Sequence, residues 1–427
     1  MPHNFRARRS VARFAVASLA ACLLVTSVNA AEPSILLPAP PPVREAVQAA
    51  WKSHPTYRVT EAELAASRAR LDAANQPLYN PELELATDDE GPDRTTTAGV
   101  ALTLDLSGKR RARSGAAAAR LTQSEAEAQL RRRNYVQQWM AAWVDVGVAS
   151  RRVSIGDQRQ TLVTRFAALA DRQFAADDIS GLDRDVALLA RDEADAEQAK
   201  LIAELSEASA RFRALGGTSQ LAAQLGLPET LLAAPSELDE AALQRLPEWA
   251  IADAALLGAQ REIVVAERNR IPDPRVSARG GRINYGGLRD NVFGVTISVP
   301  MPVRNSYRAE VVVARAEADA AAAEADRIRA QLAAESRRVV ESFSANRDAW
   351  QRWTASRGTD VERRAELLER LWREGELSTS DYLLQLNQTL DTALAGAALQ
   401  ARLWLSYFDY LAASGQLERW SGLDGTP

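Results

Sequence analysis

Two stretches decide how this chain folds: NPELELATDDEGPDRTTTAGVALTLDL (residues 80–106) and DPRVSARGGRINYGGLRDNVFGVTISV (residues 273–299). Each opens on an Asn-Pro or Asp-Pro pair and then alternates apolar with polar residues, which is the period of strands with one apolar face. The acidic segment at 88–93 and the segment with two glycines at 284–290 each predict the turn of a β-hairpin. A long segment without proline follows each hairpin and predicts very long helices.

The same pattern occurs twice, so we interpret the chain as a duplication. Each copy is predicted to contain a helix, the β-hairpin and a helical hairpin. The first helix, roughly Arg44 to Ala74, is expected to break at Pro55, and its counterpart is expected from about Leu238 to Arg270. The predicted parts are a signal peptide at 1–30, a first repeat at 31–216 (hairpin 82–106, helical hairpin 109–216), a connector at 217–247 and a second repeat at 248–427 (hairpin 275–299, helical hairpin 303–415).

Residues 1–30 have the pattern of a secretory signal, with a basic start, an apolar run and a small-residue cleavage site before Ala31. A competing interpretation is a lipoprotein signal with Cys22 as the lipidated residue. The apolar run continues past Cys22, which favours cleavage after Ala30. The rest of the chain contains no cysteine. The whole chain has a formal charge of −4, and residues 1–30 contribute four arginines and no acid, so the rest of the chain has a formal charge of −8. This acidity argues against a nucleic-acid partner.

The hairpins carry apolar positions that suit lipid. A strand with one apolar face is usually half-buried in a soluble sheet, but the helices expected here are too long to fold back over the hairpins. Four strands are too few to close a membrane barrel, and open edges are not tolerated in hydrocarbon, so several chains must pool their strands. The predicted fold is mainly α, with a membrane β-barrel that continues into an α-helical barrel. The predicted lipid-facing residues are Leu83, Leu85, Val100, Leu102, Leu104, Val276, Phe293, Val295, Ile297 and Val299.

Several short motifs resemble those of TolC-type outer-membrane efflux factors, and more narrowly the CzcC-like heavy-metal branch. They are Leu106 to Arg110, Ile271 to Pro274, Glu374 to Ser378 and Asp381 to Leu383. The resemblance implies a homotrimer with a twelve-stranded barrel in the outer-membrane lipid of a Gram-negative bacterium and a helical tunnel in the periplasm. It implies a periplasmic adaptor protein and an inner-membrane RND pump as partners. The implied function is a passive exit duct for heavy-metal cations, without enzymatic activity or cofactor.

The tips of the helical hairpins carry the candidate gate residues: Asp177, Asp178, Ser180, Gly181, Glu374, Gly375, Glu376 and Ser378. Rings of carboxylates favour cations in a pore, so the four acidic residues are predicted to form a cation-attracting ring. Helix capping is favoured instead for the neighbouring Asp183 and Asp381. The first tip departs from the family pattern of this turn, because Asp177 and Asp178 stand where the second tip has Gly375 and Glu376.

Other residues receive structural interpretations. Trp139, Trp143, Trp350 and Trp353 are predicted to pack between helices, and Arg131 to Arg133 to form a solvated face. Neither a metal-binding cluster nor a catalytic arrangement is predicted, since the chain has two histidines, His3 and His54. Two alternative functions remain: an outer-membrane channel for drug efflux or type I protein secretion, and a soluble periplasmic coiled-coil adaptor or structural protein.

Overall fold

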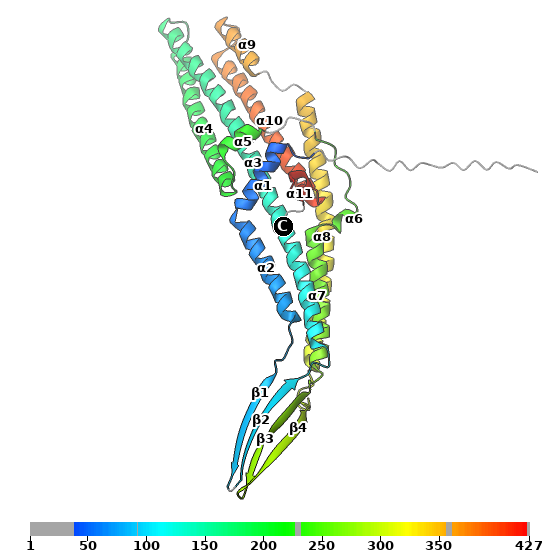
Figure 1. Ribbon diagram of the computed structural model, residues 1–427. Helices are drawn as coiled ribbons and strands as arrows, with labels where there is room; N and C mark the ends of the chain where they lie inside the picture. The colour runs from blue at the N-terminus through cyan, green and yellow to red at the C-terminus, as the bar shows by residue number, and fades with distance from the viewer. Residues whose placement is uncertain (1–37, 92, 227–231, 356–360, 425–427) are drawn as a thin grey trace, which may run out of the picture. The chain divides into compact units, whose positions relative to one another are not determined.

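The computed structural model describes residues 38–91, 93–226, 232–355 and 361–424. The predicted signal peptide and Cys22 lie outside the described residues. Within the described part, long helices lead to a small sheet at one end (Figure 1). None of the helices in these ranges is both long enough and apolar enough to cross a membrane.

The first helical segment is broken as predicted. Helix α1 spans Pro41–Ser53 and helix α2 spans Pro55–Asn75. His54 between them is extended (φ −74°, ψ 141°), because the ring of Pro55 disfavours the helical conformation at the preceding residue. Its Nδ1 accepts a hydrogen bond from the amide of Thr56 at 3.2 Å, so His54 caps α2.

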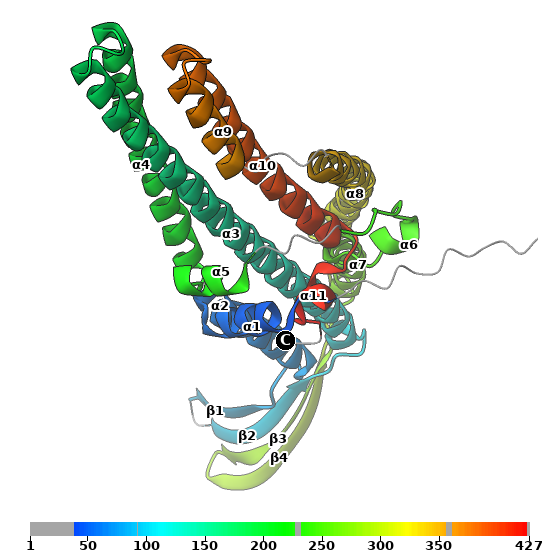
Figure 2. The same cartoon turned by 90° about the horizontal axis from the view of Figure 1, so that it is seen from above.

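The two hairpins join into one antiparallel sheet with the strand order β1-β2-β3-β4. Its strands are β1 (Glu82–Glu90), β2 (Asp93–Thr103), β3 (Arg275–Tyr285) and β4 (Leu288–Ser298). Strand β2 of the first repeat pairs with β3 of the second, which leaves β1 and β4 as the edges. Figure 2 shows that the sheet bends, as a segment of a barrel wall would.

The long helices follow the hairpins. Helix α3 (Lys109–Ala175) is one unbroken helix of 67 residues, about 100 Å long at 1.5 Å per residue. The carboxylate of Asp105 accepts hydrogen bonds from the amides of Lys109 and Arg110, both at 2.8 Å, and so fixes where α3 begins. The other helices of the two helical hairpins are α4 (Gly181–Ala214), α8 (Arg308–Ala355), α9 (Val361–Arg373) and α10 (Thr379–Ala413).

The helix that was predicted to start at about Leu238 starts later in the structure, so the end of the connector is less helical than expected. Helix α7 spans Pro247–Asn269, so it begins nine residues later than expected. Pro247 starts it because proline suits the first helical position, while Leu246 before it is extended. The short helices of this region and of the C-terminal end are α5 (Ser219–Leu225), α6 (Glu240–Leu243) and α11 (Leu417–Ser421).

Aromatic side chains hold the helices together, as predicted for the tryptophans. Trp139 is fully buried, and its ring lies 5.1 Å from that of Phe212, which joins α3 to α4. Nearer the tips, Phe166 of α3 stacks on Tyr382 of α10 at 4.3 Å, and Trp372 of α9 lies 4.6 Å from Phe166. These contacts bind the first helical hairpin to the second.

Candidate functional site

The strand register brings the predicted lipid-facing residues onto one face of the sheet. Leu83, Val100, Ala278 and Val295 are direct cross-strand partners, and residues directly opposite each other point to the same side. The two neighbouring rows on this face are Leu85–Ala98–Gly280–Phe293 and Leu102–Val276–Ile297. We call these three rows the apolar band.

The apolar band is exposed to an unusual degree. Leu83 is 73% exposed and Phe293 is 78% exposed. Val276 is half-buried. A contiguous exposed apolar surface of this kind marks a membrane or protein contact. Leu104 and Val299 from the same prediction lie one residue beyond the ends of β2 and β4, because the chain turns there toward the helices. Leu104 nevertheless donates one more ladder-like hydrogen bond, to the carbonyl of Pro274 at 2.9 Å.

The opposite face of the sheet is polar, and some of its charged side chains are close enough to form ion pairs. Arg275 forms ion pairs with Glu82 at 2.7 Å and with Glu84. Along β2, exposure alternates: residues of the apolar face are exposed and those of the polar face are half-buried or buried. This is expected if the polar face is the concave side.

The two helix-hairpin tips lie together at the end of the helical part opposite the sheet (Figure 1). They have the same turn, although the sequence of the first tip departs from the pattern of the second. Asp177 has φ +63° and Gly375 has φ +74°, both left-handed. The amides of Asp178 and Glu376 donate equivalent hydrogen bonds to the carbonyls of Gln173 and Leu371, at 2.8 and 2.9 Å. This is the six-residue closure of a Schellman motif.

Asp183 and Asp381 lie in the first turns of α4 and α10 and take part in the caps, as predicted, but the N-cap residues themselves are serines. Ser180 caps α4 by accepting from the amide of Asp183 at 3.1 Å, and Ser378 caps α10 by accepting from Asp381 at the same distance. Each serine hydroxyl also donates to the carboxylate of its aspartate, at 2.6 and 2.7 Å. The remaining tip acids are exposed, and no ion pair involves them within the described residues: Asp177, Asp178, Glu374 and Glu376.

A buried polar cluster at the junction of helices and sheet was not predicted. The side chain of Asp273 is 3% exposed and accepts from Lys109 Nζ at 2.8 Å and from the Tyr79 hydroxyl at 2.7 Å. Its other oxygen, Oδ1, is buried without a hydrogen-bond partner. The hydrogen bond to Asp273 raises the pKa of Tyr79 to about 12. The cluster ties the first repeat to the second where the helices meet the sheet. Lys109 and Asp273 lie 164 residues apart, so local sequence gave no signal for it.

The run of three arginines in α3 is not a solvated face, and that prediction is wrong. Arg132 forms an ion pair with Glu418 of α11 at 2.7 Å, Arg133 pairs with Glu248 of α7, and Arg131 with Glu63 of α2. Successive helical residues point in directions about 100° apart, so each arginine meets a different neighbouring helix. The run therefore holds four helices at one level.

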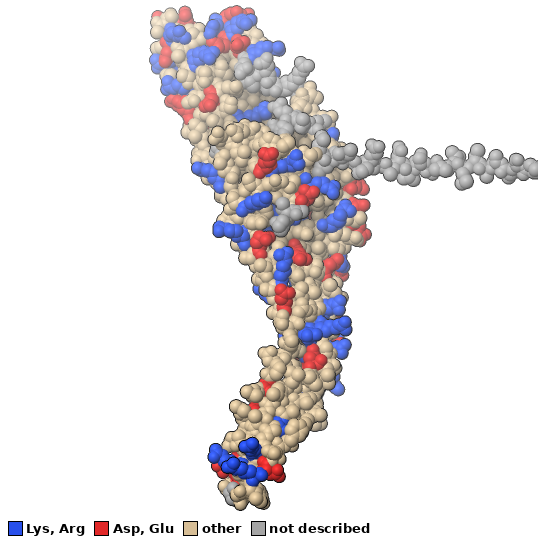
Figure 3. All heavy atoms as spheres, in the orientation of Figure 1, with Lys and Arg blue, Asp and Glu red and all other residues tan. Residues whose placement is uncertain are grey.

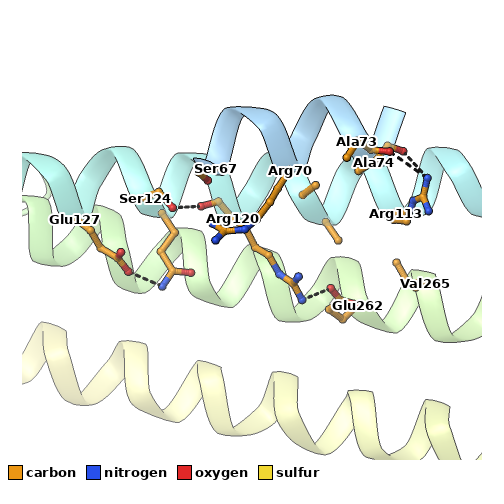
Figure 4. Close-up of a pocket in the computed structure, with 13 residues that line it drawn as sticks. Ser67, Arg70, Ala73, Ala74, Arg113, Arg120, Ser124, Glu127, Glu262 and Val265 are labelled. Carbon is orange, nitrogen blue, oxygen red and sulfur yellow. Dashed lines mark hydrogen bonds and ion pairs between the residues drawn. The ribbon is translucent and has the colours of Figure 1, made fainter. Parts of the chain in front are cut away.

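A groove of about 600 Å³ lies between α2, α3 and α7 (Figure 4). Arg113 reaches from α3 to the end of α2, where its Nη2 donates to the carbonyl of Gln76 at 3.1 Å. Arg120 forms an ion pair with Glu262 of α7 at 2.7 Å. The polar groups of this groove thus connect helices of both repeats. Across the part of the chain that is described, no group of three or more His, Cys, Asp or Glu side chains is placed to hold a metal ion.

The chain is similar in sequence to the cobalt-zinc-cadmium resistance protein CzcC of Cupriavidus metallidurans, with 31% identity over 258 residues. The match covers 59% of this chain and spans 61% of the length of that relative. No family model matches the chain.

Solved structures show the same fold. The outer-membrane channel OprN superimposes with a TM-score of 0.72 at 20% identity, covering 88% of this chain and 90% of that chain. The outer membrane protein VceC of Vibrio cholerae superimposes with a TM-score of 0.71 at 17% identity, covering 87% and 96%. The chain is thus a sequence relative of CzcC with the fold of TolC-type outer-membrane channels, as the sequence motifs predicted.

Proposed function

We propose that the protein is the outer-membrane channel of a tripartite efflux system and acts as a passive exit duct. The observation that carries the proposal is the exposed apolar band on one face of a bent, four-stranded sheet, with a polar face behind it. Such a sheet suits a barrel wall with lipid outside and water inside. The duct moves its cargo without a chemical step.

Assembly follows from the two edges of the sheet. The outer sides of β1 and β4 carry backbone groups that must be paired in hydrocarbon. Three copies that join β1 of one to β4 of the next would form a closed barrel of twelve strands, within the range of known membrane barrels. The helices of the same three copies would surround a tunnel in the periplasm. A homotrimer is therefore part of the proposal.

The partners and cargo are proposed from the relative. The name of CzcC describes resistance to cobalt, zinc and cadmium, and we propose heavy-metal cations as the cargo of this chain. An RND pump in the inner membrane and a periplasmic adaptor would supply the energy and the connection. The helix-hairpin tips, with their exposed carboxylates, would be the adaptor contact and the entrance.

Membrane fractionation and bilayer recording test the channel. The mature protein should sediment with outer-membrane marker proteins, and the purified oligomer should give stepwise conductance in a planar lipid bilayer. Release of the protein by osmotic shock alone would contradict the proposal and favour a soluble periplasmic adaptor or structural protein.

Growth assays test the cargo. A strain that lacks the gene should become more sensitive to cobalt, zinc or cadmium, and its sensitivity to drugs should not change. A chain carrying Gly281→Ala, which blocks strand pairing as argued below, is the matched control for loss of the barrel. Sensitivity to drugs alone, or loss of a secreted polypeptide, would keep the channel and replace the cargo.

A further inference from the structure

Three arginines lie on the same face of the sheet as the apolar band, nearer the hairpin turns. Arg94 of β2 and Arg289 of β4 are both cross-strand partners of Asn284 in β3. Arg282 lies two residues before Asn284 in β3, hence on the same face. Strand spacing puts Arg94 and Arg289 roughly 10 Å apart, with Arg282 about 7 Å along the strand from the line between them. The three side chains can therefore reach one ligand.

No ion pair neutralises the positive charge of this arginine cluster among the described residues. All three side chains are exposed, and they form no ion pair in the described ranges. Asp89 is opposite Arg94 on the same face but is not paired with it. The other carboxylates near the turns lie on the polar face by register: Asp88, Glu90, Asp93 and Asp290. Arg275 on that polar face, by contrast, is held by two glutamates.

The cluster lies directly beyond the apolar band. Arg282 is in the row next to Phe293, and Arg94 and Arg289 are one row further, so the cluster begins about 7 Å past the last apolar row. Figure 3 shows the same order: charged side chains gather toward the turn end of the sheet, beyond a mostly uncharged stretch. Outward arginines at that level face the headgroups of a lipid layer, not its hydrocarbon.

We propose that Arg94, Arg282 and Arg289 bind the phosphate groups of outer-leaflet lipid headgroups. The inference rests on the proposed function, which places the turns on the outer surface and the apolar band in the membrane. Arginine matches phosphate because its planar fork donates two parallel hydrogen bonds and remains charged at all relevant pH values. In a trimer the cluster would occur three times around the barrel and anchor it at a fixed depth.

Lipid binding by the purified oligomer tests the proposal. Native mass spectrometry would count bound lipid A, which carries two phosphates, and compare it with the same lipid after enzymatic removal of its phosphates. The wild-type oligomer should retain the phosphorylated form preferentially. The variant R94Q/R282Q/R289Q should lose affinity by roughly fivefold per arginine, on the order of 100-fold in total.

A matched control has the same charge change on the helices. R58Q/R68Q/R352Q replaces three exposed arginines that form no ion pair within the described part of the chain, and it should bind lipid A like the wild type. Equal loss in both variants, or equal binding of phosphorylated and dephosphorylated lipid, would overturn the proposal. Displacement of lipid A by millimolar inorganic phosphate would also overturn it, because the site would then be one for free anions.

The conductance of the same samples separates this inference from the proposed function. A variant that forms channels of normal conductance yet binds lipid A as tightly as wild type contradicts the arginine site alone. An oligomer that neither reaches the outer membrane nor conducts contradicts the channel itself.

Discussion

Asp177 is the residue with the most unusual backbone conformation at the tips. An L-residue in the left-handed region costs about 1–2 kcal/mol, and less for Asp than for most residues. The equivalent position of the second tip is Gly375, which has no such cost. The duplicated turn is therefore kept at both tips, and the first tip carries some strain in exchange for a carboxylate.

Asp177→Gly should stabilise the first tip by up to about 1 kcal/mol. The measurement is the temperature at which the helical circular dichroism signal of the oligomer is lost, which should rise. Ala176→Gly is the control, because Ala176 has φ −91° and gains nothing from glycine. An equal rise for both variants would show that the left-handed conformation carries no strain.

The arginine run offers a direct comparison of a buried and an exposed ion pair. The side chain of Arg132 is 11% exposed and its partner Glu418 24%, whereas Arg131 and Glu63 are 37% and 52% exposed. Arg132→Gln leaves a largely buried carboxylate alone and should lower the free energy of unfolding by up to about 3 kcal/mol. Arg131→Gln should cost less than about 1 kcal/mol. Urea unfolding followed by circular dichroism measures both losses. Similar losses of unfolding free energy in the two variants would contradict the greater burial of the Arg132–Glu418 pair.

Tyr79 gives a pH dependence whose sign is set by its partner. Its pKa is raised from 10 to about 12, mainly by the hydrogen bond to Asp273. A raised folded-state pKa means that its contribution to stability is complete below pH 10 and is lost as the pH rises toward 12. Tyr79→Phe should remove that part of the alkaline loss of stability, measured as the melting temperature from pH 9 to 12.

Tyr57→Phe is the control for this titration, since Tyr57 packs against Trp51, outside the Asp273 cluster. If Tyr79→Phe and the wild type lose stability in parallel above pH 10, the hydrogen bond to Asp273 does not form.

At the level of the elements, the joint between β2 and β3 is the critical one. A Cβ at Gly281 would overlap the carbonyl oxygen of Thr96 and would lie 2.7 Å from the Cα of Thr97. Gly280, its neighbour on the other face, has its nearest atom at 3.8 Å. At Gly281 the backbones of β2 and β3 therefore approach too closely for a side chain on the polar face of the sheet, whereas a side chain at Gly280 has room on the other face.

Gly281→Ala should disrupt the pairing of the two hairpins and so prevent assembly of the oligomer, whereas Gly280→Ala should assemble. The measurement is the fraction of protein that migrates as a folded oligomer on an unheated gel. Normal assembly of Gly281→Ala would show that β2 and β3 do not pair in this register.

The elements were largely predictable because their signals are local. Period-two alternation located all four strands, and Pro55 located the break between α1 and α2. The connector was less predictable: the duplication suggested a helix from about Leu238, but the start of α7 depends on Pro247 and on the extended residue before it. The ends of β2 and β4 were also shorter than alternation implied, because the chain leaves the sheet to enter the helices.

In the whole molecule, the proposed trimer would repeat the tip carboxylates around an aperture. Asp177, Asp178, Glu374 and Glu376 are exposed, and they are not needed as caps because Ser180 and Ser378 serve in that role. A ring of such carboxylates would raise the local concentration of cations.

Replacing these four residues by Asn or Gln should lower the cation-to-anion permeability ratio of single channels. Raising the salt concentration is the control, since screening should diminish the difference between variant and wild type. Unchanged selectivity at low salt would rule out the tip acids as the selectivity ring.

The sequence by itself determined the elements, the duplication and the apolar side of each strand, because these depend on residues a few positions apart. The tertiary structure alone decided which strands pair, and therefore that the arginine cluster lies on the face opposite to Asp88, Glu90, Asp93 and Asp290. It also decided the partners of Arg131 to Arg133 and of Asp273. Those contacts join residues far apart in the chain, and register and burial are set only when the two repeats pack together.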